Sequence, residues 1–173
     1  MCCVSKTAIK SILKSKRIGD DNLDLLPTLV ASIQNNPSNA ELIFSIFGLF
    51  LNVASDVKGL SALESLDDIN TVAVGAIRDH PNSPELHEVT FALLQNTVNA
   101  DCESEDSANL ILLSMKNYPE EEMLQINGCK LLALLCSQSQ AAQTLARNDL
   151  NILSLASENY SSCQRFVDGI LGN

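Results

Sequence analysis

The chain has 173 residues, of which 46% are hydrophobic and only 4% aromatic, and it contains no tryptophan. A chain of this length can bury a substantial core, but that core must be aliphatic, as helices packed on helices allow. The formal net charge of −10 repels phosphate backbones, which argues against nucleic acid as a partner and favours a basic protein or peptide. The alternative is that the acidic residues only solvate the exterior.

Residues 1–19 are expected to form a basic N-terminal capping helix with an apolar side. Five basic residues occur there before the first acid: Lys6, Lys10, Lys14, Lys16 and Arg17. Cys2 and Cys3 precede this stretch, and adjacent cysteines beside basic charge are typical of S-acylation, which can hold a protein at a membrane. The alternative is that the lysines simply form the exposed face of the capping helix.

Residues 20–173 are expected to form one repeat domain, because a single apolar pattern recurs along them. Its clearest copy, residues 119–136, aligns without gaps on residues 37–54 and 81–98. Apolar residues follow each proline at offsets that advance by about three or four, which is helical periodicity. In the three copies they are Leu42, Phe47, Leu49, Phe50 and Ala54; Leu86, Phe91, Leu93, Leu94 and Val98; Leu124, Cys129, Leu131, Leu132 and Cys136.

A fourth, weaker copy appears if Tyr160 takes the place of the proline. Val167 then matches Ile126, and Gly169 matches Gly128. The four copies begin at residues 37, 81, 119 and 160, which are 44, 38 and 41 residues apart. A helix–turn–helix unit repeating at this period predicts an all-α solenoid.

The expected helices end where a proline or a polar cluster interrupts the pattern. They cover residues 23–34, 40–54, 69–78, 85–98, 108–117, 120–136, 139–147, 150–158 and 162–173, with a short linking segment at 56–66. Asp67 and Asp68 are expected N-caps, Glu120 to Glu122 are expected in a first helical turn, and residues 99–107 are expected to be a mobile acidic loop. The last helix is expected to be about six residues shorter than its counterparts. Three explanations are open: the chain is cut from a longer protein, the end is frayed, or a partner covers it.

The sequence of elements over residues 139–171, a short helix, a longer helix, a break and a third helix, resembles the armadillo repeat family. The resemblance covers about residues 20–171 and implies a right-handed α–α superhelix of about four repeats. It also implies that the third helices line a concave groove that binds extended peptides. HEAT repeats, which have two helices, are the close alternative, although the short segments at 56–66 and 139–147 favour armadillo. The family's usual glycine between the first two helices is replaced here by Asp67–Asp68 and Asn148–Asp149.

The less apolar stripe of each third helix is the expected partner-binding face, because its residues are spaced by three and four. The stripe residues are Glu41, Ser45, Gly48 and Asn52; Glu85, Val89, Ala92 and Asn96; Met123, Asn127, Lys130 and Leu134. Small side chains let a partner backbone approach, and Asn can both donate to it and accept from it. The alternative is a solvated face with no ligand.

The resemblance also shows which peptide chemistry this face lacks. In importin-alpha proteins each third helix offers a tryptophan and, one turn later, an asparagine that bonds the peptide backbone. Asn52 and Asn96 match the asparagine, but Gly48, Ala92 and Lys130 stand at the tryptophan position. Recognition of basic localisation signals by stacked aromatic rings is therefore not expected.

No catalytic, cofactor or metal site is expected. The sequence has no nucleophile elbow and no phosphate-binding glycine loop, and its two histidines and six cysteines without C-x-x-C spacing suit no zinc cluster. Cys129 and Cys136 occupy apolar positions and are expected to be reduced core residues. Gly48, Gly128 and Gly169 fall inside repeat helices, where we expect close packing to explain them.

These expectations describe a non-enzymatic protein-interaction scaffold. No apolar run approaches the roughly 20 residues that span a bilayer, and the first residues lack the apolar block of a secretory signal, so a cytoplasmic location is predicted. The alternative function is a membrane-tethered adaptor held by acylated Cys2 and Cys3. Whether the chain forms homo-oligomers stays open, because exposed solenoid ends commonly stack.

Overall fold

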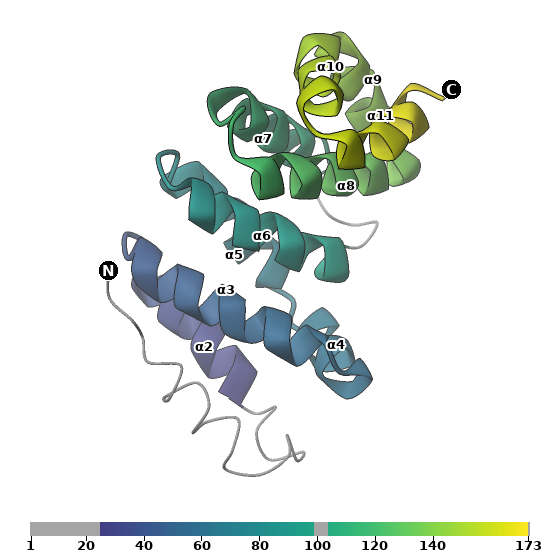
Figure 1. The fold of residues 1–173 in the computed structure, drawn as a ribbon. Helices are drawn as coiled ribbons and strands as arrows, with labels where there is room; N and C mark the ends of the chain where they lie inside the picture. The colour runs from purple at the N-terminus through teal and green to yellow at the C-terminus, as the bar shows by residue number, and fades with distance from the viewer. Residues whose placement is uncertain (1–24, 99–103, 173) are drawn as a thin grey trace.

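The computed structural model describes residues 25–98 and 104–172, which form ten α-helices and one 3-10 turn and contain no strand (Figure 1). The predicted all-α class is therefore confirmed for this part of the chain. The expected capping helix at 1–19, with Cys2 and Cys3, lies outside the described residues. The helices are α2 (Leu25–Asn35), α3 (Ala40–Ala54), α4 (Val57–Glu64), α5 (Ile69–Asp79), α6 (Pro84–Thr97), α7 (Ser104–Asn117), α8 (Glu122–Gln138), α9 (Gln140–Asn148), α10 (Leu150–Asn159) and α11 (Gln164–Leu171), with the 3-10 turn η2 at Ser161–Cys163.

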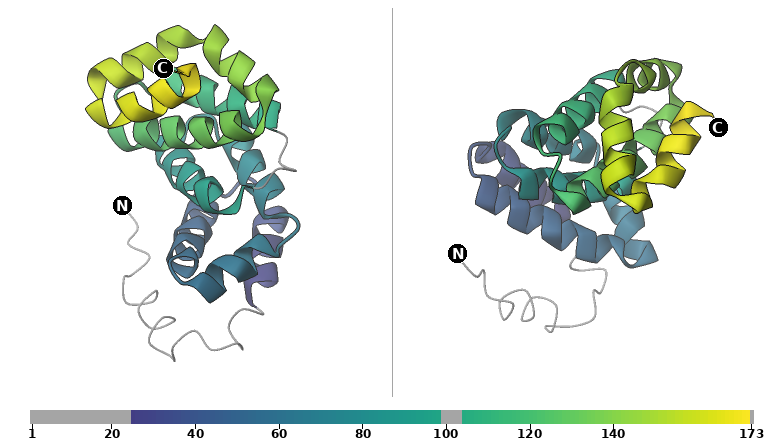
Figure 2. Two further views of the ribbon diagram at one scale, coloured as in Figure 1. Left: turned by 90° about the vertical axis from the view of Figure 1, so that its right-hand side faces the viewer. Right: turned by 45° about the horizontal axis from the view of Figure 1, so that its top comes forward.

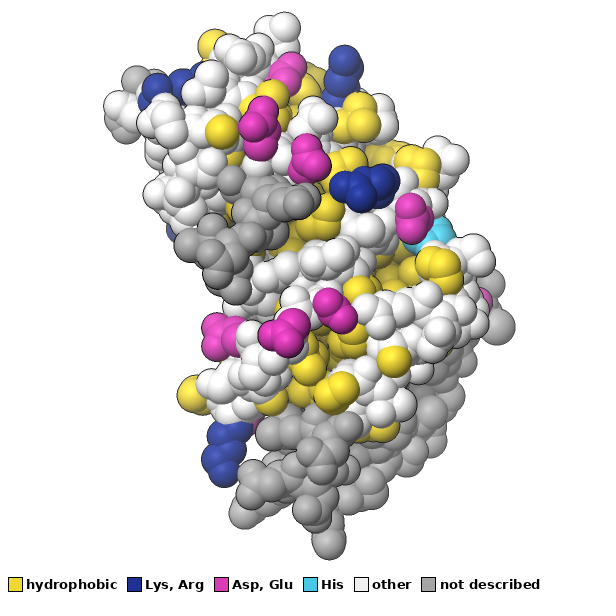
Figure 3. Space-filling model, turned by 180° about the vertical axis from the view of Figure 1, so that it is seen from behind, with side chains coloured by type: hydrophobic (Ala, Val, Ile, Leu, Met, Phe, Trp, Pro, Cys, Tyr) yellow, Lys and Arg dark blue, Asp and Glu magenta, His cyan; other side chains and the backbone are white. Residues whose placement is uncertain are grey.

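The helices pack in two layers (Figures 1 and 2), and Figure 3 shows the molecule from behind. The front layer consists of α3, α6, α8 and α11, each of which contacts the next in that order. The back layer consists of α2, α5, α7 and α10, and each of these also contacts its partner in the front layer. The short helices α4 and α9 follow α3 and α8 and pack against them. Segments about 40 residues apart in the sequence therefore become direct neighbours.

The recurring apolar positions form the core that joins the front-layer helices. Phe47, Phe91 and Cys129, which share one offset in the three copies, all have 0% exposure. The next shared position holds Phe50, Leu94 and Leu132, which are also buried. Because each of these side chains covers the flank of a neighbouring unit, removing water from them favours stacking of the units.

Three helices begin on side chains that accept hydrogen bonds from the first turn. Asn39 Oδ1 accepts from the amide of Leu42 at 3.0 Å, and Asp56 and Ser139 cap α4 and α9 in the same way. The expected cap at Asp68 is wrong: its backbone is already near-helical (φ −95°, ψ −2°) and its side chain makes no capping bond. The carboxylate instead accepts from Gln34 Nε2 at 3.2 Å, which ties α2 to the start of α5.

Two predicted boundaries in the middle of the chain need correction. Helix α7 begins at Ser104, so residues 104–107 of the expected acidic loop are helical, whereas residues 99–103 lie outside the described residues. Glu105 and Asp106 lie in the first turn of α7, where they interact favourably with the helix dipole. Helix α8 begins at Glu122, so Glu120 and Glu121 precede it. The cause is a turn after the proline break, in which the amide of Glu121 donates to the carbonyl of Tyr118 at 3.3 Å.

The end of α11 is held by contacts from a different helix. Gly172 adopts the left-handed conformation (φ 77°) that closes many helices. Arg147 of α9 donates to the last carbonyl groups of α11, with Nε 3.4 Å from Ile170 O and Nη2 3.2 Å from Leu171 O. Helix α11 is therefore fixed to the end of the stack by backbone contacts as well as by its apolar face.

Close packing explains one of the three helix glycines named above. A Cβ on Gly128 would lie 2.7 Å from Met115 Sδ, so the Met115 side chain packs directly on this glycine and would have to shift to accommodate an alanine. A Cβ on Gly48 or Gly169 would meet no atom within 4 Å. The packing explanation is therefore wrong for Gly48 and Gly169, and Gly48 lies on an open part of α3.

Candidate functional site

The stripes on α3 and α6 remain accessible in the folded chain. Their end residues are exposed and their central residues half-buried: Glu41, Asn52, Glu85 and Asn96 are exposed, and Ser45, Gly48, Val89 and Ala92 are half-buried. Because α3 and α6 are neighbours in the front layer, these eight residues lie on adjacent helices at equivalent positions. A segment crossing α3 would therefore meet α6 next.

The polar groups of these stripes bond to their own helices. Asn52 Nδ2 donates to Gly48 O and Asn96 Nδ2 donates to Ala92 O, each at 2.8 Å. Ser45 Oγ donates to Glu41 O at 2.8 Å. These bonds hold each Asn side chain along its helix and use one of its two amide protons. The side-chain oxygen of each Asn remains available to accept from a peptide N–H.

The stripe predicted on α8 is only partly correct. Asn127 is buried, with 7% exposure, and its backbone carbonyl accepts a hydrogen bond from Gln95 Nε2 of α6 at 3.2 Å. Asn127 therefore does not lie on an open face. Met123 is 49% exposed, and Lys130 and Leu134 are half-buried. Helix α8 packs against α6, α7, α9 and α11 together, and these neighbours cover a side that the sequence pattern left open.

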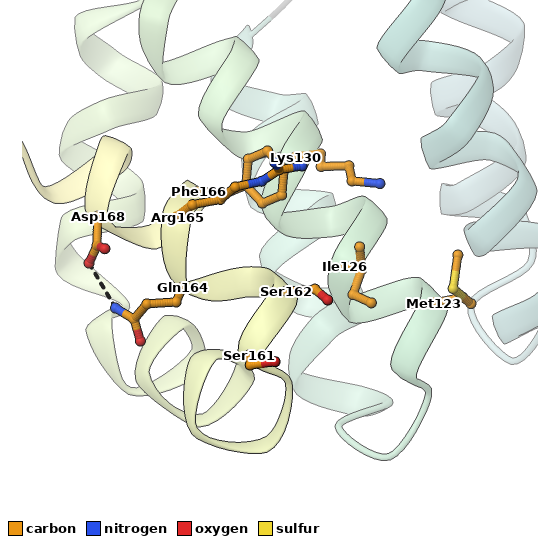
Figure 4. Close-up of a pocket in the computed structure, with 9 residues that line it drawn as sticks. All are labelled: Met123, Ile126, Lys130, Ser161, Ser162, Gln164, Arg165, Phe166 and Asp168. Atoms are coloured by element: carbon orange, nitrogen blue, oxygen red, sulfur yellow. Dashed lines mark hydrogen bonds between the residues drawn. The ribbon is translucent and has the colours of Figure 1, made fainter.

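A hollow of about 680 Å³ opens between α8 and the segment formed by η2 and α11 (Figure 4). On α8 it is lined by Met123, Ile126 and Lys130, so Ile126 takes the place that the sequence assigned to Asn127. On the other side it is lined by Ser161, Ser162, Gln164, Arg165, Phe166 and Asp168. Sequence reasoning missed this second side, because α11 comes from the weakest copy of the repeat. We call this feature the α8–α11 hollow.

Three side-chain contacts define the chemistry of the α8–α11 hollow. The guanidinium carbon of Arg165 lies 4.4 Å from the ring centroid of Phe166, a cation–π contact. Gln164 Nε2 donates to Asp168 Oδ1 at 2.7 Å (Figure 4). No ion pair joins Lys130 or Arg165 to a carboxylate among the residues that the structure describes. The hollow therefore offers cationic and apolar groups together.

The beginnings of α6 and α8 carry charge of the opposite sign. Glu88 is half-buried, and its pKa is raised first by this burial and then by the nearby Glu121 and Glu85. Neighbouring carboxylates that disfavour one another's ionisation create a negative potential at this edge. A cationic group placed there would relieve the repulsion. Glu120, Glu121 and Glu122 also act electrostatically on Tyr160, next to the lining residue Ser161, so this negative edge reaches one side of the α8–α11 hollow.

Hydrogen bonds between successive units form what we call the break ladder. His80 Nε2 donates to the carbonyl of Pro37 at 2.7 Å, and Tyr118 Oη donates to that of Pro81 at 2.5 Å. Tyr160 Oη donates to the carbonyl of Pro119 at 3.2 Å. Tyr160 therefore corresponds to the residue before the proline, as His80 and Tyr118 do, and its predicted alignment with the proline itself is wrong by one position.

His87 is a buried polar residue within this region. Its Nε2–H donates to the carbonyl of His80 at 2.9 Å, so Nδ1 accepts from the hydroxyl of Ser114, 2.6 Å away. Burial lowers the pKa of His87, because a charged imidazole would lose its hydration. Gln125 takes the same role in the next unit, where Nε2 donates to the carbonyl of Tyr118 at 2.9 Å. Both residues secure a break and line no hollow described above.

The cysteines within the described ranges are free thiols. Cys129 and Cys163 are buried, as predicted for Cys129, whereas Cys136 is half-buried. Burial raises the pKa of the Cys129 and Cys163 thiols, and it raises that of Cys136 to about 11. A thiol with a raised pKa holds little of the reactive thiolate at neutral pH. These cysteines therefore act as apolar packing groups.

Over residues 25–98 and 104–172, no three His, Cys, Asp or Glu side chains group closely enough to hold a metal ion. No described helix combines the length and apolar character needed to cross a bilayer. No protein-family model, curated protein or solved structure matches the chain. The described residues form two layers of stacked helices, with accessible stripes on α3 and α6 and the α8–α11 hollow.

Proposed function

We propose that this chain is a non-enzymatic scaffold that binds an extended segment of a partner protein along its front layer. The observation that carries the proposal is the consecutive packing of α3, α6, α8 and α11, with the stripes of α3 and α6 left accessible. An extended segment crossing these helices would meet the same set of groups once per unit. Repeated weak contacts of this kind suit a peptide better than a small molecule.

The stripes favour a segment with basic side chains over α3 and α6. Glu41 and Glu85 are exposed at the first turns of their helices, and Glu88 lies one turn after Glu85. The Cβ position of Gly48 faces open space, so a partner backbone can approach α3 closely. The Asn52 and Asn96 side-chain oxygens can then accept its N–H groups.

The proposed fold is an armadillo-like right-handed superhelix of about four units. Its support is the order of a short helix followed by two longer ones over α4 to α6. Helices α9 to α11 repeat the three-helix order, but with similar lengths of 9, 10 and 8 residues. The unit formed by α7 and α8 has two helices among the described residues, as in a HEAT repeat. The unit α4 to α6 therefore gives the main support for the armadillo arrangement.

Selection of a phage-displayed random peptide library on the full chain tests the proposed function. We expect enriched peptides to carry net positive charge. Gly48→Lys should weaken their binding, because it fills the α3 stripe and adds like charge. Gly75→Lys is the matched control: a Cβ there also meets no atom within 4 Å, but Gly75 belongs to α5 in the back layer.

Equal binding of the enriched peptides to both variants, with helicity unchanged by circular dichroism, would place the binding site elsewhere. Failure to enrich any peptide would contradict the proposal directly. Enrichment of acidic peptides that bind at α3 and α6 would contradict the charge assignment for these two helices alone.

A further inference from the structure

We propose that the α8–α11 hollow is an acidic-peptide subsite, which takes a Glu or Asp side chain together with a neighbouring apolar side chain. The inference rests on the proposed function, because it places this acidic stretch on the same partner segment that crosses α3 and α6. The partner is therefore expected to be basic where it crosses α3 and α6 and acidic where it reaches α8 and α11. The whole chain has a net charge of −10, so a local excess of cations needs a specific account.

The cationic part of the subsite consists of Lys130 and Arg165, which reach it from opposite walls. Arg165 lies over the Phe166 ring, and this contact restricts the guanidinium while its N–H donors stay free for a carboxylate. Lys130 is half-buried on α8, so water screens its charge less than that of a fully exposed lysine. A carboxylate entering the hollow would therefore meet donors from two helices.

The one carboxylate in the lining weakens this field only in part. Asp168 accepts from Gln164 Nε2 at 2.7 Å, so one of its oxygens is already engaged by a neutral donor. Two cations and one carboxylate leave a net charge of +1 on the lining. Glu122 at the beginning of α8 acts on Cys163 together with Lys130, so this carboxylate reduces the cationic field at the η2 side of the hollow, and the field is strongest near Arg165.

The apolar part of the subsite explains why a simple anion would not fill it. Met123 is 49% exposed, and Ile126 and Phe166 complete an apolar surface beside the cations. A methionine adapts to apolar groups of different shapes, which suits contact with a partner side chain. The hollow, at about 680 Å³, is the size of a site for a few side chains and is too small for a whole helix.

The hydroxyl groups of Ser161 and Ser162 add donors and acceptors at the rim (Figure 4). Both serines are exposed, so a peptide backbone can reach them. A segment with basic residues over α6 and an acidic–apolar pair in the α8–α11 hollow would bind in one direction only. Reversing it would place like charges together at both ends, which is costly. Acidic residues on α3 and α6, together with Lys130 and Arg165 in the α8–α11 hollow, thus set the polarity of the bound segment.

The test uses the full chain, labelled with ¹⁵N, and three synthetic peptides, GSEELFG, GSQQLFG and GSKKLFG. We expect GSEELFG to shift the amide signals of the first half of α8 and of α11. The neutral peptide should bind at least about fivefold more weakly, and the basic peptide should leave these signals unchanged. Lys130→Glu and Arg165→Glu should each weaken binding of GSEELFG by about tenfold. Arg78→Glu, the same charge change on back-layer helix α5, should not.

Equal affinity for GSEELFG and GSQQLFG would overturn the inference, as would shifts confined to other helices or full binding by Lys130→Glu. Lys130→Gln provides a second variant without charge reversal and should give an intermediate loss. The library selection with Gly48→Lys separates the two proposals. If GSEELFG binds at α8 and α11 while Gly48→Lys leaves the library peptides unaffected, the subsite stands and the proposed function fails. If GSEELFG does not bind at α8 and α11 while Gly48→Lys weakens binding of the library peptides, the subsite is excluded and the proposed function remains supported.

Discussion

Helix α4 meets the end of α3 at a point where only glycine fits. Gly59 is buried, and a Cβ built on it would lie 2.2 Å from Val53 O and 2.8 Å from Val53 Cγ1. The nearer contact is with a backbone carbonyl, which cannot rotate away as a flexible side chain can. Gly59→Ala therefore requires α4 to move away from α3 by about 1 Å to restore ordinary contact.

The cost follows from two opposing effects. Overpacking of this kind destabilises a fold by about 1–3 kcal/mol, and a rigid carbonyl places this site at the upper end. Replacing glycine by alanine inside a helix recovers up to about 1 kcal/mol. We therefore expect Gly59→Ala to lower the free energy of unfolding by about 2 kcal/mol. Gly48→Ala should raise it by about 0.5–1 kcal/mol, because its Cβ meets no atom within 4 Å.

Urea unfolding followed by circular dichroism at 222 nm measures both variants against the wild type. The two variants then differ by about 2.5–3 kcal/mol, and unfolding slopes of about 1–3 kcal/mol per molar urea predict midpoints that differ by roughly 1–3 M. Trypsin cleavage after Lys58 shows whether α4 alone detaches in Gly59→Ala. A midpoint for Gly59→Ala equal to or above that of Gly48→Ala, with no faster cleavage at Lys58, would refute the packing argument.

Three further predictions concern single side chains. Tyr118→Phe removes the hydrogen bond to Pro81 O and should lower the free energy of unfolding by about 1 kcal/mol, measured by the urea midpoint. Burial lowers the pKa of His87 below 6.5, so the unfolded chain binds a proton at this residue more readily than the folded chain does. The free energy of unfolding should therefore be highest above pH 6.5 and should fall as the pH drops through 6.5 towards the folded-state pKa, by at most about 1.4 kcal/mol per pH unit. His87→Gln should remove that part of the pH dependence and keep the bond to His80; an unchanged pH profile would exclude His87 as its source. Cys136, with its pKa raised from 9.0 to about 11, should react with iodoacetamide about 100-fold more slowly than a free thiol at pH 8, and urea should abolish the difference; rapid labelling of the folded chain in a peptide mass map would show that the thiol is not buried.

The helix positions followed from the sequence because they depend on local features. The spacing of Phe47, Phe91 and Cys129 identified one buried position in three helices, and all three have 0% exposure. The prolines at 37, 81 and 119 marked the breaks, because the residue before a proline avoids the helical region. The predicted bounds of α3 agree with the structure at both ends.

The candidate site was predicted only where each helix has few neighbours. The stripes of α3 and α6 are accessible as expected, but Asn127 is buried because α6 covers its side of α8. The break ladder also escaped prediction, since it joins residues 37 to 43 positions apart. The cationic part of the α8–α11 hollow depends on Arg165, which lines the hollow together with Lys130 although no spacing rule relates the two residues.

The helical class, the breaks between helices and the side chains of the aliphatic core can all be predicted from the amino-acid sequence. Such properties arise within one helix, where periodicity reports directly on its faces. Which of the open faces remain open depends on how the helices pack, because a face is buried by whatever neighbour packs on it. The stacking of α11 on α8 brings two cations and three apolar side chains together in an otherwise acidic chain. That hollow is a property of the packed units and of no single repeat.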